Sequence, residues 1–367
     1  MQEEAKEEAK QPPEPEKPKA SDAAADLEET LEEGEVVSPS RVMGSRIVAS
    51  AVKPYIHGVF AVDWRWVEGD EAIPNTLELR EAHVYVGAHI LDIAQSEVFF
   101  ELEKKNQTDD PIKLRYGQVD VRVFDELLVL RGGLFLVPFG VYNTELFLRW
   151  DAKLPERPDI HRHIVPGSWS EVGVQAHGKW EWSPGRVLQY AAYVTNGQEG
   201  SLTPDRATYD PVYRSLSGAK SFGARVTVRP LEGFQVGLSG YHGALNGAGG
   251  ALILGGLDFI FRRGPFSVDG EAIYGQRMDP GPIPEAGFYA AAGYWVTEAI
   301  EPVIGVSGYS LGPTEEEKDL DVQVGVNVRP FAERFPSAML KAAYNRDFSS
   351  RGPAGDNSVT ILFVIGF

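Results

Sequence analysis

The sequence contains no cysteine, which excludes disulfide bonds, thiolate zinc sites and thiol catalysis. It has no run of about 18 apolar residues, so a transmembrane helix is excluded. It also lacks a basic stripe, and at a net charge of −18 nothing would replace the counterions of a nucleic acid. The opening MQEEAKEEAK is acidic, whereas a signal peptide starts with a basic segment. We therefore expect no nucleic-acid partner and take Met1 as an initiator placed before a mature chain.

The charge is concentrated at one end. Residues 1–37 carry 13 acidic residues and 4 lysines, a net charge of −9, and have almost no large apolar side chain to bury. We expect an acidic Pro/Glu/Ala-rich tail at 1–37, disordered or partly helical.

From about residue 53 the hydrophobic pattern has a period of two. The segment DVQVGVNVR places four valines on one face and mostly polar residues on the other, as a strand between two environments requires. The pattern predicts sixteen strands, at 53–66, 77–90, 95–104, 112–123, 127–138, 169–182, 186–196, 218–229, 233–244, 251–262, 265–276, 286–296, 300–311, 318–329, 337–347 and 357–367.

The connections between these strands alternate between short and long. The short set includes FDE, SPG, LEG, RG and TEA, whereas the long set is polar or rich in glycine and proline. Outer-membrane barrels have this arrangement, with short periplasmic turns, longer external loops and an even number of antiparallel strands. Their first and last strands pair, because in lipid no water can form hydrogen bonds with the backbone of an unpaired sheet edge. We therefore expect an all-β fold: a transmembrane antiparallel β-barrel of about 16 strands over 53–367, in the bacterial outer membrane with both termini periplasmic. The tail at 1–37 is then periplasmic, and 38–52 is a linker or a lumen plug.

Aromatic residues are expected at the two membrane interfaces, where girdles of such residues flank a barrel. A soluble β-domain is the alternative, and it would need a second packed layer that the polar faces do not support. The residues assigned to the girdles are Trp64, Trp66, Trp169, Trp180, Trp182, Tyr193, Tyr241, Tyr294, Trp295, Tyr309, Tyr344 and Phe348.

The stretch RGGLFLVPFGVYNTE, with YIHGVFAVDWRW before it and VPGSWSEVGVQAHGKW after it, resembles the phosphate-selective porin O/P family of outer-membrane channels. The residues that match the family's Gly-x-Phe-x-x-Pro-Phe-Gly motif are Gly133, Phe135, Pro138, Phe139 and Gly140. The resemblance implies a porin surrounded by outer-membrane lipid, assembled as a homotrimer, with the loop at 139–168 folded into the lumen; an external flap is the alternative for this loop. Leu134 and Leu136 stand where family members often carry Lys or Arg, which weakens the expectation of phosphate selectivity.

Alternation of faces places nine cationic and ten acidic side chains in the lumen, and the loop at 139–168 adds four of each sign. Selectivity follows the local charge at a constriction rather than the total. We expect a water-filled pore of weak selectivity, with Arg131, Arg149, Arg157 and Arg162 meeting the solutes; the alternative is a nearly closed lumen in which these charges pair. The residues assigned to the pore lining or constriction are Arg131, Arg149, Lys153, Arg157, Arg162, Glu101, Asp120 and Arg225.

No catalytic residues, metal ligands or cofactors are expected, and the protein is not expected to be an enzyme. His161 and His163 in DIHRH have no third ligand near them in the sequence, and no Gly-x-Ser-x-Gly elbow occurs.

The sequence supports two functions. The first is a porin that passes small hydrophilic solutes or ions by passive diffusion. The second is a structural barrel that anchors a multi-protein envelope complex, with the acidic tail reaching periplasmic or envelope partners. In the last strand Phe363, Ile365 and Phe367 are expected to face lipid, and they resemble the signal that the barrel assembly machinery recognises.

Overall fold

The computed structural model describes residues 52–68, 77–102, 112–165, 168–197, 218, 220–245, 250–278, 281–312, 318–348 and 357–367. The tail predicted at 1–37 and all but the last residue of the segment at 38–52 lie outside this part of the chain. Within the described ranges, no helix is both long enough and apolar enough to cross a membrane.

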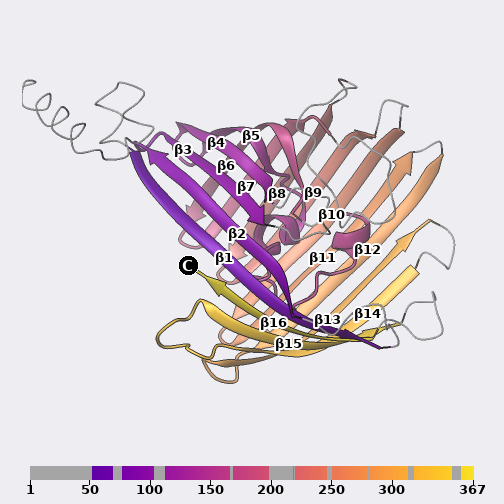
Figure 1. Cartoon of the computed structure of the whole chain (residues 1–367). Helices are drawn as coiled ribbons and strands as arrows, with labels where there is room; N and C mark the ends of the chain where they lie inside the picture. Colours follow the sequence, from indigo (N-terminus) through magenta and orange to yellow (C-terminus); the bar gives the residue numbers. More distant parts are fainter. Residues whose placement is uncertain are drawn as a thin grey trace, which may run out of the picture. The chain divides into compact units, whose positions relative to one another are not determined.

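Sixteen strands form one closed antiparallel barrel, in which each strand pairs with its neighbours in sequence and β1 pairs with β16 (Figure 1). The strands are β1 (Val52–Val67), β2 (Leu77–Ile90), β3 (Ala94–Leu102), β4 (Ile112–Phe124), β5 (Leu128–Leu136), β6 (Ser170–Ser183), β7 (Arg186–Thr195), β8 (Ser221–Leu231), β9 (Phe234–Leu245), β10 (Gly250–Arg263), β11 (Phe266–Met278), β12 (Pro282–Tyr294), β13 (Ile300–Leu311), β14 (Lys318–Val328), β15 (Ala338–Asp347) and β16 (Ser358–Gly366). Two short helical segments, η1 (Tyr142–Leu146) and α4 (Ile160–His163), lie between β5 and β6.

All sixteen predicted strands are confirmed, and their predicted ends differ from the observed ends by at most four residues. The largest difference is at β12, which begins at Pro282 although the expected start was residue 286. Pro282 and Pro284 indicate a loop in the sequence, yet proline is tolerated at the start of a strand. The connection between β11 and β12 is therefore 279–281, and long and short connections differ less in the second half of the barrel than predicted.

The two faces of each strand differ in the way the alternation predicts. In β10 the side chains of Leu254 and Asp258 are buried inside the barrel, whereas Ile253, Leu257 and Phe259 are exposed on its outer surface. Large apolar side chains are likewise exposed on other strands, including Val121, Leu130, Val174, Phe222, Val226, Leu238, Phe288, Ile304, Val324 and Ile361. An apolar band of this kind is the surface that a barrel presents to lipid.

The barrel closes between β1 and β16, as predicted. Gly58 N–H donates to the Phe367 carbonyl at 2.8 Å, and Phe367 N–H donates back to the Gly58 carbonyl at 2.9 Å. The Phe367 ring lies where a Cβ on residue 58 would stand. Closure leaves no unpaired sheet edge, the condition for a sheet in hydrocarbon.

Candidate functional site

Between β5 and β6 the described residues 137–165 and 168–169 run through the interior of the barrel; we call them the inserted segment. Their polar contacts reach strands on several sides of the wall, so the segment is not an external flap. Arg149 Nε lies 3.1 Å from Glu81 Oε1 on β2, and the Lys153 ammonium pairs with Asp269 on β11. Further contacts reach β9, β13, β14 and β16. The prediction that this loop folds into the lumen is confirmed.

Glycine is required where the inserted segment begins. Gly140 has φ +66°, and a Cβ there would stand 1.8 Å from the Glu271 carboxylate. That carboxylate accepts the Tyr142 N–H at 3.1 Å, and Gly140 N–H donates to Ser239 Oγ at 3.0 Å. Gly133 has φ +123°, and a Cβ there would approach the Gly117 carbonyl oxygen to 2.3 Å. Two glycines of the motif are thus explained by backbone conformation and close contact.

Gly140→Ala is expected to destabilise the protein by about 1–3 kcal/mol, because it combines a strained φ with a clash against Glu271. The matched control is Gly132→Ala, since nothing lies within 4 Å of a Cβ at Gly132. The readout is the midpoint of thermal unfolding in detergent, followed by the heat-modifiable mobility of the folded barrel. Equal midpoints for the two variants would contradict the role given to Gly140.

Lys341 on β15 holds the middle of the inserted segment. Its ammonium donates to the carbonyl oxygens of Arg149 at 2.6 Å and Trp150 at 3.2 Å, and also to that of Ala152. The side chain is 1% exposed. A buried ammonium with its three donors satisfied by backbone carbonyls is stable only while that backbone stays in place. Lys341 therefore fixes the position of residues 149–152 inside the barrel.

The inserted segment packs on one side of the barrel through an apolar cluster. Phe139, Ile160 and Ile164 are fully buried and belong to the same cluster as Leu252 and Leu254 of β10. The cluster also contains Trp169, Tyr193, Tyr241 and Tyr309. The assignment of these four aromatic residues to the interfacial girdles is wrong: Trp169 belongs to the inserted segment, and the three tyrosines are buried in the same interior cluster.

The other residues assigned to the girdles include both inward-facing and exposed side chains. Trp295 also faces the interior, where it lines a cavity beside Arg329. The residues that are exposed, as the girdle assignment expects, are Trp66, Trp180, Trp182, Tyr294, Tyr344 and Phe348.

A polar cavity of about 550 Å³ lies between the inserted segment and the wall formed by strands β3 to β9; we call it the first cavity. Thr144 and Glu145 of the segment face it. The wall contributes cationic side chains, carboxylates and glutamine amides. The cationic residues are Arg122, Arg131, Lys179, Arg225 and Arg229, the acidic residues are Asp120 and Glu126, and the glutamines are Gln95, Gln175, Gln189 and Gln235. The interior is thus polar on this side, whereas the apolar cluster lies on the side of β10 to β13.

Three residues assigned to the pore line the first cavity. Arg131 makes a bidentate pair with Asp120, with Nε–Oδ1 at 2.7 Å and Nη2–Oδ2 at 2.8 Å. Arg225 pairs with Asp258, and its Nη2 lies 2.9 Å from Oδ1. Such forked contacts fix a guanidinium in orientation. Arg131, Asp120 and Arg225 are therefore rigid groups on the wall of the cavity.

The other residues assigned to the pore lie away from the first cavity. Arg149 is 5% exposed and, with Arg157 at 3.7 Å, pairs with Glu81. Lys153 pairs with Asp269. Glu101 is buried and contacts Arg115 and His83. Arg162 lies in α4, and its side chain is outside the described part of the structure. Many of the opposed charges thus pair, in line with the alternative stated from the sequence.

Of the remaining family-motif residues, Phe135 lies in β5, whereas Pro138 and Phe139 follow its end, which comes two residues before the predicted end at 138. Phe135 and Phe139 are fully buried. In β16 Phe363 is exposed on the outer face and Ile365 shares that face, with Phe367 beyond them. Their role as an assembly signal stays a prediction.

The two histidines of DIHRH are packing residues. His161 stacks on Tyr142 with ring centroids 4.3 Å apart and lies 3.5 Å from Glu271. His163 stacks on Tyr309 at 4.1 Å. Their rings therefore join the apolar packing of the segment.

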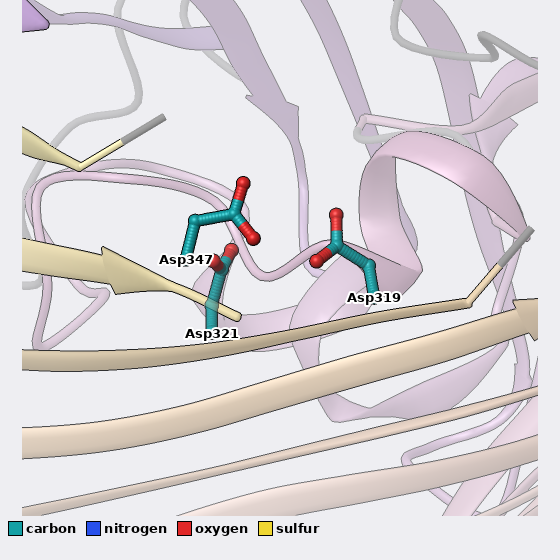
Figure 2. A group of neighbouring side chains, drawn as sticks. All are labelled: Asp319, Asp321 and Asp347. Carbon is teal, nitrogen blue, oxygen red and sulfur yellow. The ribbon is translucent and has the colours of Figure 1, made fainter. Parts of the chain in front are cut away.

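Three carboxyl groups meet at the opposite end of the barrel from Lys341. Asp319 and Asp321 of β14 and Asp347 of β15 have carboxyl oxygens within 4.8 Å of one another (Figure 2). Asp321 was predicted to face inward, but its proximity to Asp347 depends on the β14–β15 register, which the sequence does not specify. Carboxyl groups alone do not define a metal site, and we assign none here.

These features define a class of fold: a closed sixteen-stranded antiparallel barrel, apolar outside, whose interior is narrowed by an inserted segment. The barrel is similar to OmpT, an outer membrane protein of Vibrio cholerae in its trimer form, with a TM-score of 0.60, 12% identity and coverage of 86% of this chain and 100% of that one. The anion-selective porin from Comamonas acidovorans gives the same four values. OmpF of Salmonella typhi in complex with daunomycin gives a TM-score of 0.56 and 10% identity over 87% of this chain and 99% of that one. These likenesses show the fold.

Similarity in sequence is limited. No protein-family model matches the chain, so the resemblance to the phosphate-selective porin O/P family rests on the motifs quoted above. An uncharacterized protein of Aquifex aeolicus (strain VF5) is 23% identical over 175 residues, which make up 45% of this chain and 38% of that protein. The match thus spans about two fifths of that relative's length.

Proposed function

We propose that the protein is an outer-membrane porin that passes small hydrophilic solutes or ions by passive diffusion. The observation that carries the proposal is the first cavity, a polar space of about 550 Å³ inside a closed barrel whose outer surface is apolar. Water in this space would solvate a solute while the barrel keeps it from lipid. The porin folds of the compared structures support the same function.

The path we propose runs along strands β3 to β9. Of the four arginines predicted to meet the solutes, Arg131 stays in this path, whereas Arg149 and Arg157 are held against Glu81 on another side of the segment. Arg122, Lys179 and Arg229 join it. Since Asp120, Glu126 and Glu145 line the same cavity, we expect weak selectivity.

The setting of the barrel is part of the same proposal. We place it in the bacterial outer membrane with its short turns and both termini on the periplasmic side, because outer-membrane barrels carry their longer loops outside. A homotrimer and membership of the phosphate-selective porin O/P family are the assembly and family that the motifs favour. Cross-linking of the detergent-solubilised protein tests the trimer.

The test is single-channel recording of the purified protein in planar bilayers at high salt. Stepwise current increments of uniform size are expected after insertion. The heat-modifiable mobility of the protein recovered from the bilayer lipid shows whether it has inserted. Insertion without current increments would overturn the proposal and favour a structural barrel.

A further inference from the structure

The inserted segment leaves a second cavity on the side of the barrel opposite the first. It has a volume of about 260 Å³ and lies between residues 150–153 and the short-turn ends of strands β10 to β15. Its position is fixed, because Lys341 on its wall holds the backbone of those segment residues. The second cavity is therefore bounded by groups that cannot easily move into it.

Two guanidinium groups face this cavity without a carboxylate partner. Neither Arg262 nor Arg329 forms an ion pair within the part of the chain that the structure describes. The Arg329 guanidinium lies over the Trp295 ring at 4.0 Å from its centroid, and its Nε–H is buried without an acceptor. A buried donor left unpaired costs about 1–3 kcal/mol. Because Arg329 also lines the cavity, a ligand there that brings an acceptor can bind its guanidinium group.

The other charged groups of the second cavity are engaged or exposed. Lys341 donates to backbone carbonyls, and Lys153 pairs with Asp269. Glu301 Oε2 accepts a hydrogen bond from Asn327 Nδ2 at 2.8 Å. Asp151 is exposed and attracts both Lys341 and Arg262. The cavity is lined by four cationic side chains against two carboxylates, so its lining carries a net positive charge.

The second cavity also has an aromatic and apolar lining, formed by Trp150, Trp295, Phe266 and Met339. An inorganic ion would satisfy the arginines and leave this apolar lining uncovered. A ligand with a flat ring and an acidic group would contact both kinds of wall.

We propose that the second cavity binds a small aromatic carboxylate. Its carboxylate accepts hydrogen bonds from Arg329 and Arg262, since the guanidinium fork matches two carboxylate oxygens. Its ring packs against Trp150 and Trp295. This site goes beyond the porin proposal, because binding is measured without any current.

The test is equilibrium dialysis of radiolabelled 4-hydroxybenzoate against the full-length protein in detergent. Saturable binding to one site per chain is expected, with competition by benzoate but neither by acetate, which lacks the ring, nor by benzyl alcohol, which lacks the charge. Arg329→Gln is expected to weaken binding roughly tenfold or more. Arg122→Gln, which removes a cation from the first cavity, is the matched control and should bind like the parent.

Heat-modifiable mobility shows whether each variant is folded. If Arg329→Gln does not fold, Arg262→Gln replaces it, because Arg262 is exposed and its loss leaves no buried group unpaired. The proposal is overturned if the parent shows no saturable binding, if acetate competes as well as benzoate, or if the folded arginine variant binds like the parent. None of these results bears on whether the barrel conducts.

Discussion

Replacing residues 141–165 with a short Gly-Ser turn is expected to raise single-channel conductance several-fold. These residues fill the side of the interior lined by β10 to β13 and narrow the remaining space to the first cavity. Because ionic current increases with the open cross-section, their removal should act on conductance more strongly than any single substitution. The measurement is the mean current step at fixed voltage and high salt.

The matched control removes 199–216, which belong to another long connection, between β7 and β8. This second deletion is expected to change conductance far less. The deletion of 141–165 should also lower the midpoint of thermal unfolding, because Leu252, Leu254 and Ile273 lose their apolar partners. An unchanged current step from a folded deletion variant would contradict the position assigned to the segment.

The strands could be predicted from the sequence because each lies between lipid and a polar interior. That contrast produces a period of two, which β14 shows from Asp319 to Val328. The same alternation also predicts which way Tyr193 of β7 points. Gln189, Ala191, Tyr193 and Thr195 share one face of β7, so Tyr193 had to point inward. Tyr193 lies near the end of β7, but the face it occupies, and not its distance from the strand end, determines that it points inward.

The division of the interior could not be predicted. It depends on contacts between residues far apart in the chain: Lys153 with Asp269 is separated by 116 residues, and Lys341 with the Arg149 carbonyl by 192. No local pattern encodes such pairs. Alternation placed Lys341, Asp269 and Glu271 inside the barrel, but only the fold shows that they hold the segment rather than line the path.

The chain contains no cysteine, so a single introduced cysteine can be labelled selectively. A single cysteine introduced at Gln189, which is exposed on the wall of the first cavity, should react with a cationic methanethiosulfonate reagent from the aqueous phase. The added bulk and charge in the narrowed path should then lower the current. A cysteine at Val226 is the matched control, because Val226 lies on the neighbouring strand next to this register position but faces outward.

We propose that solutes pass along β3 to β9 beside the inserted segment. Recording the current of single Gln189→Cys channels before and after the reagent tests this path most directly. We predict a stepwise fall in current in each channel, reversed by a reducing agent, with no change for Val226→Cys or for the cysteine-free parent. Complete modification of Gln189→Cys, verified by mass, with an unchanged current would contradict the claim.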